Sequence, residues 1–355
     1  MSQRIVGVLA VSLFLVACSS SPGSDAGQGG GLGIGGGGGT SGAGGGGSQI
    51  TADQACTSSA QARCMQEQNC VPNTLAIDYG DLSTCESRLK ASCLASLGAV
   101  GSGTTIEGVA ACANAYASWS CSDWVNGFPP EACKPAQGIL TEGAPCAFNG
   151  QCVTSWCSVP RGASCGTCAT APALGSSCAG GTTCGNQAGL YCETNGNTCQ
   201  ALVTDAGSFC DAGSCGYGLG CVIAMGSTSG TCQPLGAVVD AGCDAQQRTA
   251  AACRRDLGLA CIRKHCSQDP LSSPGQQCGL ELDAGVVVEC SASGACVADG
   301  GVSSCVAPQA EGTACDTAAG KVCFTPARCV SADGGSTDGG AVVGTCQLPS
   351  GTLCQ

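Results

Sequence analysis

The chain has few aromatic residues, which usually fill the core of a globular protein, and almost no histidine, which often serves in catalytic and metal sites. Phe, Tyr and Trp number only 5, 4 and 3 in 355 residues, and there is one histidine. Such a chain cannot build one large apolar core. Lysine and arginine together number 13 against 25 acidic residues, for a net charge of −12. That balance argues against nucleic-acid binding, which needs a basic surface. No apolar run reaches the roughly 18 residues of a membrane-spanning helix.

Cysteine and glycine, by contrast, are abundant, with 35 and 58 residues. Such a cysteine content is typical of disulfide scaffolds in oxidising compartments. Cys18 stands alone, and all the others lie between Cys56 and Cys354. Each bridge typically stabilises a fold by about 2–4 kcal/mol by restricting the unfolded chain. We therefore predict small disulfide-rich modules: a short α-helical, disulfide-stapled module followed by irregular cysteine-rich repeats with short strands.

Residues 1–17 have the features of an export signal. A single positive charge precedes an apolar run over 5–16, which is too short to span a bilayer. The run ends in Leu15-Val16-Ala17-Cys18, which resembles the lipobox of bacterial lipoproteins. The resemblance implies cleavage between Ala17 and Cys18 and a lipid on the Cys18 sulfur. An ordinary signal peptide with an incidental cysteine is the alternative.

The lipobox resemblance also implies a location. Two or more acyl chains anchor a protein stably, so the expected partner is a membrane of the bacterial cell envelope. Ser19 follows the cysteine, where an aspartate commonly retains such proteins at the inner membrane; the outer membrane is therefore favoured. Residues 18–49 form the lipidated cysteine and a glycine-rich flexible linker, whose coil dimension is about 30 Å.

Residues 50–135 carry eight cysteines in a helical pattern. Cys56 and Cys64 are eight positions apart, as are Cys85 and Cys93, which places each pair on nearly one helix face. The pattern predicts three or four short helices stapled by four disulfides. Eight cysteines allow 105 pairings, among which the sequence does not choose.

Polar residues mark the expected helix ends. Thr51 or Asp53 can cap the first helix, and Gly98 can end the second. Ser83-x-x-Glu86 and Thr104-x-x-Glu107 are capping boxes expected to start the second and third helices.

The tryptophans of this module allow two interpretations. Trp119 and Trp124 can supply its scarce core area, with Trp124 on a short fourth helical turn. They could instead form a surface recognition patch. We favour the core.

Residues 138–355 contain a repeat in which Gly-x-x-Cys recurs. The leading cysteines are spaced by 32 to 39 residues: Cys146, Cys178, Cys210, Cys243, Cys278, Cys315 and Cys354. Three further cysteines complete each unit, with Cys165 as the fourth cysteine of the first unit and Cys168 left over. We predict six units of two bridges each, because units below about 40 residues need cross-links to fold. The array is expected to display an extended surface.

Turn and strand signals occur between the cysteines. Asn149-Gly150, Asn195-Gly196 and Asp333-Gly334 suit tight hairpin turns. The runs 219–223 and 285–288 can form brief strands, and 245–257 is the one stretch of the array with a helical pattern.

These units resemble the cysteine-rich repeats of bacterial surface lipoproteins and the cysteine-rich region at the N-terminus of Dickkopf proteins. The resemblance lies in the spacing of cysteine and glycine. Dickkopf proteins bind receptors, so the resemblance implies an interaction role. It transfers no contact residue to this chain.

The sequence predicts no catalytic residue, cofactor or metal site. Cys165-Gly-Thr-Cys168 has the spacing of a redox pair or half a zinc site, but no helix follows to activate a thiol. Structural disulfides are favoured there. His265 is the lone histidine, and the chain lacks the Gly-x-Ser-x-Gly motif that would supply the nucleophile of a Ser-His-Asp hydrolase.

One cluster of positive charge stands out in this acidic chain. It could contact an anionic polysaccharide or lipid headgroup, although a solvated helix face is the simpler interpretation. Its members are Arg248, Arg254, Arg255, Arg263 and Lys264.

Together these features predict a non-catalytic, lipid-anchored surface protein that interacts with a protein or polysaccharide, or has a structural role, at the cell envelope. A protease-resistant spacer without a specific partner is the first alternative. A protease inhibitor or hydrolase accessory is the second.

Overall fold

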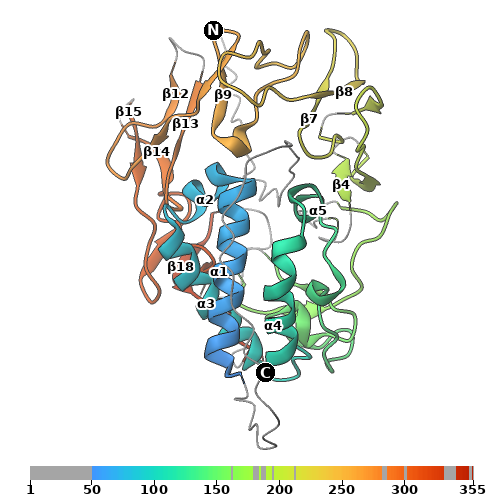
Figure 1. Cartoon of the computed structure of the whole chain (residues 1–355). Coiled ribbons are helices and arrows are strands. Elements are labelled where there is room, and N and C mark those ends of the chain that lie inside the picture. The colour runs from blue at the N-terminus through green and yellow to red at the C-terminus, as the bar shows by residue number, and fades with distance from the viewer. Residues whose placement is uncertain are drawn as a thin grey trace, which may run out of the picture.

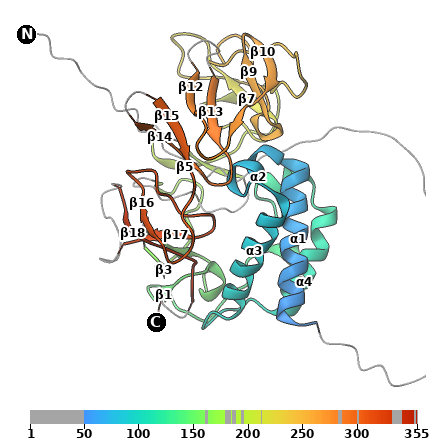
Figure 2. The ribbon, with the colours of Figure 1, turned by 90° about the vertical axis from the view of Figure 1, so that its left-hand side faces the viewer.

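The computed structural model describes residues 50–160, 163–178, 184, 189–193, 196–211, 213–281, 286–299, 302–331, 341–351 and 354. The predictions for 1–49, Asn195, Gly285 and Asp333-Gly334 lie outside these residues. Helices gather on one side of the molecule and small sheets on the other (Figures 1 and 2). None of the helices described is both long enough and apolar enough to cross a membrane.

The helical side contains five α-helices. They are α1 (Ala52–Cys70), α2 (Pro72–Asp78), α3 (Leu82–Leu97), α4 (Ile106–Ala115) and α5 (Cys121–Val125), with short 3-10 turns at Tyr116–Ser118 and Glu131–Cys133. Thr51 caps α1 in a capping box with Gln54, and Gly98 ends α3, as predicted. The sequence analysis missed α2, although Pro72 at its first turn is a favourable start.

Two predicted helix starts were wrong by one or two residues. The cap of α3 is Asp81 instead of Ser83, because the Asp81 carboxylate accepts the N–H of Thr84 at 2.8 Å. The cap of α4 is Thr105 instead of Thr104, because its hydroxyl accepts the N–H of Gly108 at 3.0 Å. In each case the true cap is the residue whose oxygen reaches the third amide of the helix.

Four disulfides staple the helices, as predicted. Cys56–Cys93 and Cys64–Cys85 join α1 to α3 as two rungs, which explains the repeated spacing of eight. Cys70–Cys121 joins α1 to α5, and Cys112–Cys133 joins α4 to the following turn.

The main apolar cluster of the helical side confirms the core interpretation of the tryptophans. Trp124 is 9% exposed and packs with Val71, Val125 and Tyr217. Trp119 packs against the same cluster and is half-buried. Tyr217 comes from the repeats, so this core is shared between the two sides.

Within the described residues, the repeats form seven small sheets. Their strands are β1 (Pro145–Cys146), β2 (Cys157–Ser158), β3 (Gly166–Cys168), β4 (Leu190–Glu193), β5 (Thr198–Ala201), β6 (Phe209–Cys210), β7 (Leu219–Val222), β8 (Gly230–Pro234), β9 (Leu259–Ile262), β10 (His265–Gln268), β11 (Leu271–Ser272), β12 (Gly279–Glu281), β13 (Val286–Cys290), β14 (Ala295–Asp299), β15 (Val302–Val306), β16 (Ala314–Asp316), β17 (Arg328–Val330) and β18 (Val343–Gln347). The strand predicted over 219–223 is β7.

Every unit has the same disulfide pattern, in which the first cysteine bonds the third and the second bonds the fourth. The third and fourth cysteines lie directly opposite each other on one hairpin. These opposed pairs are Cys157/Cys168, Cys192/Cys199, Cys221/Cys232, Cys261/Cys266, Cys296/Cys305 and Cys329/Cys346. The hairpin therefore places two sulfurs side by side, and the preceding chain attaches to both.

The Gly-x-x-Cys signature has a structural reason. The glycine takes a left-handed conformation, with φ of 77° to 84° in five units, and its N–H donates to the carbonyl of the fourth cysteine. Asp240 occupies this position in the fourth unit, with φ of 65° and the same hydrogen bond to Cys266 at 2.8 Å. A left-handed residue is needed here, and aspartate tolerates that conformation better than most residues.

The structure corrects the predicted cysteine assignment of the first unit. Its fourth cysteine is Cys168, which bonds Cys152, whereas Cys165 bonds Cys354. The amide of Gly143 donates to the Cys168 carbonyl at 2.8 Å, as the signature requires of a fourth cysteine. The leftover cysteine is therefore Cys165.

Two local predictions in the array were wrong. Asn149-Gly150 lies in a 3-10 turn over Asn149–Gln151 instead of a hairpin turn. Of the stretch 245–257, only Arg255–Leu257 is helical, as a 3-10 turn. The Asp244 carboxylate accepts the backbone N–H groups of residues 246, 248 and 249, which bends this stretch into a loop.

Candidate functional site

The most distinctive feature of the structure is that the array returns to its own beginning. Cys165–Cys354 joins the first unit to the segment that follows the sixth, across 189 residues. In Figure 2 the sheet containing β16–β18 lies beside the sheet containing β1–β3, with the helices along one side of both. The predicted extended array is therefore closed, and the junctions that close it are the candidate functional site.

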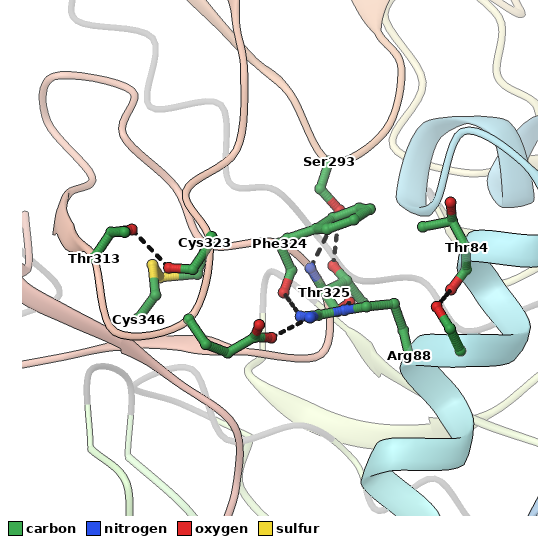
Figure 3. Close-up of polar contacts among 11 residues, drawn as sticks. Thr84, Arg88, Ser293, Thr313, Cys323, Phe324, Thr325 and Cys346 are labelled. Atoms are coloured by element: carbon green, nitrogen blue, oxygen red, sulfur yellow. Dashed lines mark hydrogen bonds and ion pairs between the residues drawn. A yellow bond between two sulfur atoms is a disulfide. The ribbon is translucent and has the colours of Figure 1, made fainter.

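The first junction is a clamp made by Arg88 of α3 on the sixth unit. Its Nε donates to the Thr325 carbonyl at 2.8 Å, and a second nitrogen donates to the Phe324 carbonyl at 2.6 Å. The same guanidinium lies 4.9 Å from the centre of the Phe324 ring and pairs with Glu311 (Figure 3). The side chain is only 13% exposed. One planar cation thus makes hydrogen bonds, an ion pair and a ring contact at once.

The second junction caps the C-terminal end of α2. The amide of Ala292 donates to the carbonyl of Ala76 at 2.9 Å, and Ser293 donates to the carbonyls of Ile77 and Asp78 through its amide and hydroxyl. The last carbonyls of a helix lack a partner in a following turn, and Ala76 also accepts the amide of Gly80 at 3.1 Å. Ala292 and Ser293 have φ of 54° and 58°, so this loop adopts a left-handed turn that presents its amides to the helix.

The third junction joins the first unit to the loop between α3 and α4. Gln151 is 2% exposed, and its Nε2 donates to the Val100 carbonyl at 2.8 Å. Its Oε1 accepts the amides of Ala147 and Phe148, at 2.7 and 3.0 Å. One buried amide side chain therefore accepts two backbone amides of its own unit and donates to a carbonyl of the neighbouring loop.

A fourth junction joins α5 to the third and fourth units. The Asn126 side chain accepts the amide of Tyr217 at 3.2 Å. The Arg254 guanidinium stacks 4.1 Å from the centre of the Tyr217 ring and donates to Asp256 at 2.8 Å. Arg254 is 5% exposed, which makes it a structural cation between units.

The predicted cationic cluster is divided by this arrangement. Arg254 is buried, and Arg255 pairs with Asp269 and Glu289 at 3.1 and 3.2 Å. Arg248, Arg263 and Lys264 are exposed, and within the residues described they form no ion pair. Arg254 therefore lies apart from the exposed members, and contact of the cluster with an anion stays a prediction.

The cysteine groups of the units are pairs of packed disulfides. Three sulfurs come within 4.8 Å of one another in several units, a distance that could suit a metal ion. All of them are bonded to other sulfurs and offer no thiolate ligand. Cys165 and Cys168 bond to different partners, so this motif is structural, as favoured.

Two cavities of the described part of the chain lie where parts of the molecule meet. One of about 300 Å³ lies between the third and fourth units and is lined by Gln246, Gln247 and small or apolar residues. The other, of about 170 Å³, lies at the third junction beside Cys354. No ionisable side chain lines either of them. His265 is exposed in β10, with Nδ1 3.3 Å from the Asp240 carbonyl.

Glu67 of α1 is buried, and Asp78 at the end of α2 is half-buried. Burial raises the pKa of Glu67 above 4.5, the Asp78 carboxylate raises it further, and Arg63 opposes both. Burial likewise raises the pKa of Asp78, and it raises the pKa of Tyr79 to about 12. The Arg63 Nε lies 3.8 Å from Glu67, too far to offset the burial.

Sequence reasoning missed the residues that make these junctions. Arg88 had the appearance of an ordinary helix-surface cation, and Gln151 that of a loop residue. Their partners lie 51 to 237 positions away in the sequence. A local sequence pattern carries no information about contacts over such separations. The one hint of a long-range link in the sequence was that two cysteines fell outside the four-cysteine units, one in the first unit and the other Cys354.

A comparison of the chain with protein-family models, curated proteins and solved structures finds no match.

Proposed function

We propose that the chain is a lipid-anchored, non-catalytic protein of the bacterial cell envelope, whose disulfide-locked head has an interaction or structural role. The observation that carries this proposal is the pairing of every cysteine from Cys56 to Cys354. Such pairing requires an oxidising compartment. Cys18 alone is left over, at the end of the lipobox.

The closed head supports a role that depends on shape and durability. Its disulfides and junctions hold the loops at fixed places, which lowers the entropy lost on binding. Neither of the two cavities described above is lined by an ionisable side chain, which supports a non-catalytic role. The flexible linker would hold this head roughly 30 Å from the anchoring membrane, at the outer membrane if Ser19 directs sorting.

Metabolic labelling with palmitate tests the anchor. Wild type should incorporate label and sediment with membranes, whereas Cys18→Ala should do neither. Ser19→Ala is the matched control and should remain labelled. A labelled Cys18→Ala variant, or an unlabelled wild type, would contradict the anchor.

The spacer alternative is favoured by the same covalent closure, because cross-links alone resist proteolysis. A pull-down from the cell surface with the oxidised chain 19–355 separates the two roles. Recovery of one surface component at a fixed ratio supports the interaction role, and recovery of none supports the spacer.

A further inference from the structure

The repeat units do not need the Cys165–Cys354 bridge to form their own disulfides. All six units keep both of their own bridges without it, because the first unit uses Cys152–Cys168. The other disulfides close loops of 11 to 51 residues inside the helical side or inside one unit. This bridge spans 189 residues and belongs to neither. Its structural effect is confined to closing the array.

The bridge holds a segment that packs tightly over the third junction. Cys354 is 5% exposed, and Gly351 lies so close to the loop between α3 and α4 that an added Cβ would come within 2.3 Å of the Ala99 Cβ. Val100, Gln151 and Cys354 line the same small cavity. Opening the bridge therefore releases a segment that touches both the helical side and the first unit.

We propose that Cys165–Cys354 is a thiol-labile clasp, which a dithiol reductant opens before any other bridge, freeing the end of the array while the six units stay intact. This proposal goes beyond the envelope function and does not depend on the lipid anchor.

The exchange has a defined direction. Cys165 is half-exposed whereas Cys354 is buried, so a reductant thiolate attacks the Cys165 sulfur. A mixed disulfide forms at Cys165, and Cys354 leaves as a thiolate that takes up a proton. The second thiol of the reductant then attacks the mixed disulfide. Cys165 is released as a thiol, and the reductant leaves oxidised to its own disulfide.

Loop size makes the clasp easier to open than a unit bridge. After the first attack, the freed thiol can reverse the reaction only while it stays nearby. A unit bridge closes a loop of 11 to 23 residues, so its freed thiol stays close to its partner, while the clasp closes a loop of 189 residues. From the length dependence of loop closure we expect the clasp to reduce at about tenfold lower dithiol concentration than the unit bridges.

Graded reduction of the wild-type protein, with alkylation and mass spectrometry at each step, tests the order. Cys165 and Cys354 should be alkylated first. Cys278–Cys296 is the demanding control, because Cys296 is exposed and an order set by access alone would reduce it earlier. Reduction of any unit bridge before or together with the clasp would overturn the proposal. So would a mixed disulfide trapped on Cys354 instead of Cys165 by a dithiol protein that lacks its second cysteine.

A second set of variants tests the opening itself by small-angle scattering. Arg88→Ala with the clasp intact should leave the radius of gyration unchanged. The same substitution combined with Cys165→Ser and Cys354→Ser should enlarge it, with the unit bridges still formed. An unchanged radius in the combined variant would show that the bridge does not hold the array closed.

Discussion

The Arg88 guanidinium lies 4.9 Å from the centre of the Phe324 ring, although 236 residues separate the two in the chain. The contact joins the second long helix of the chain to its last repeat unit. Together with the cap on α2 and the buried Gln151, it makes the helices and the array one body. The repeats therefore enclose one side of the helices and are not displayed as an extended chain.

Removal of the Arg88 guanidinium should loosen this body. Arg88→Ala leaves the carbonyls of Phe324 and Thr325 without their donors, and we expect a loss of about 2 kcal/mol, in the range for hydrogen bonds to charged groups. Urea unfolding followed by tryptophan fluorescence measures it. Arg88→Lys should recover less than half of the loss, because an ammonium cannot reproduce the planar fork.

Lys90→Ala is the matched control for that loss. Lys90 lies on the same helix and pairs at 2.7 Å with Asp53, whose side chain is 67% exposed. Exposed pairs contribute little, so this change should cost less than about 0.5 kcal/mol. Equal losses for the two variants would mean that the clamp adds nothing to stability.

The cap on α2 should make Gly80 intolerant of a side chain. Gly80 has φ of 82°, and an added Cβ would lie 2.9 Å from the Ala292 Cβ. Gly143 has φ of 83° with open space around the same position. Gly143→Ala should therefore cost about 1 kcal/mol from the left-handed backbone alone. Gly80→Ala should cost about 1–2 kcal/mol more, because the docked loop must shift.

Hydrogen exchange locates the Gly80 effect. In Gly80→Ala the amides of Ala292 and Ser293 should lose protection, because both donate to α2. In Gly143→Ala they should keep it. Equal protection in the two variants would contradict a cap that depends on close approach.

Burial of Glu67 should make stability depend on pH. Its folded pKa is raised above the unfolded value of 4.5, chiefly by burial. The stability linked to this carboxyl is thus fully present below pH 4.5 and is lost as pH rises through the folded pKa. Glu67→Gln should therefore be more stable than wild type at pH 7, with the difference disappearing below about pH 4. Urea midpoints from pH 3 to 7 measure this, and a constant difference would contradict it.

The positions of the helical module and of the repeat units were largely predictable from the sequence, although the disulfide pairing within them was not. Paired spacings of eight placed Cys56, Cys64, Cys85 and Cys93 on helix faces, and the structure bonds them as two rungs. The Gly-x-x-Cys signature located the repeat units because it marks a left-handed turn. These features are local, so neighbouring residues encode them.

The closure of the array could not be predicted in the same way. Cys165 and Cys168 lie three positions apart in one motif, so the sequence alone does not tell which of them belongs to the unit. The hairpin register, in which Cys168 lies opposite Cys157, assigns Cys168 to the unit. The sequence analysis grouped Arg254 and Arg255 in a cluster of surface charge. The structure pairs them with Asp256 and Asp269. Long-range pairing depends on how finished units pack, and a single sequence carries little trace of that.

Disulfide mapping of the unreduced protein tests the closed, cross-linked head most directly. Digestion and mass spectrometry should find a peptide pair joined by Cys165 and Cys354, first-to-third and second-to-fourth bridges in each unit, and no free thiol between Cys56 and Cys354. Cys165 bonded to Cys152 instead, or many free thiols, would contradict the account.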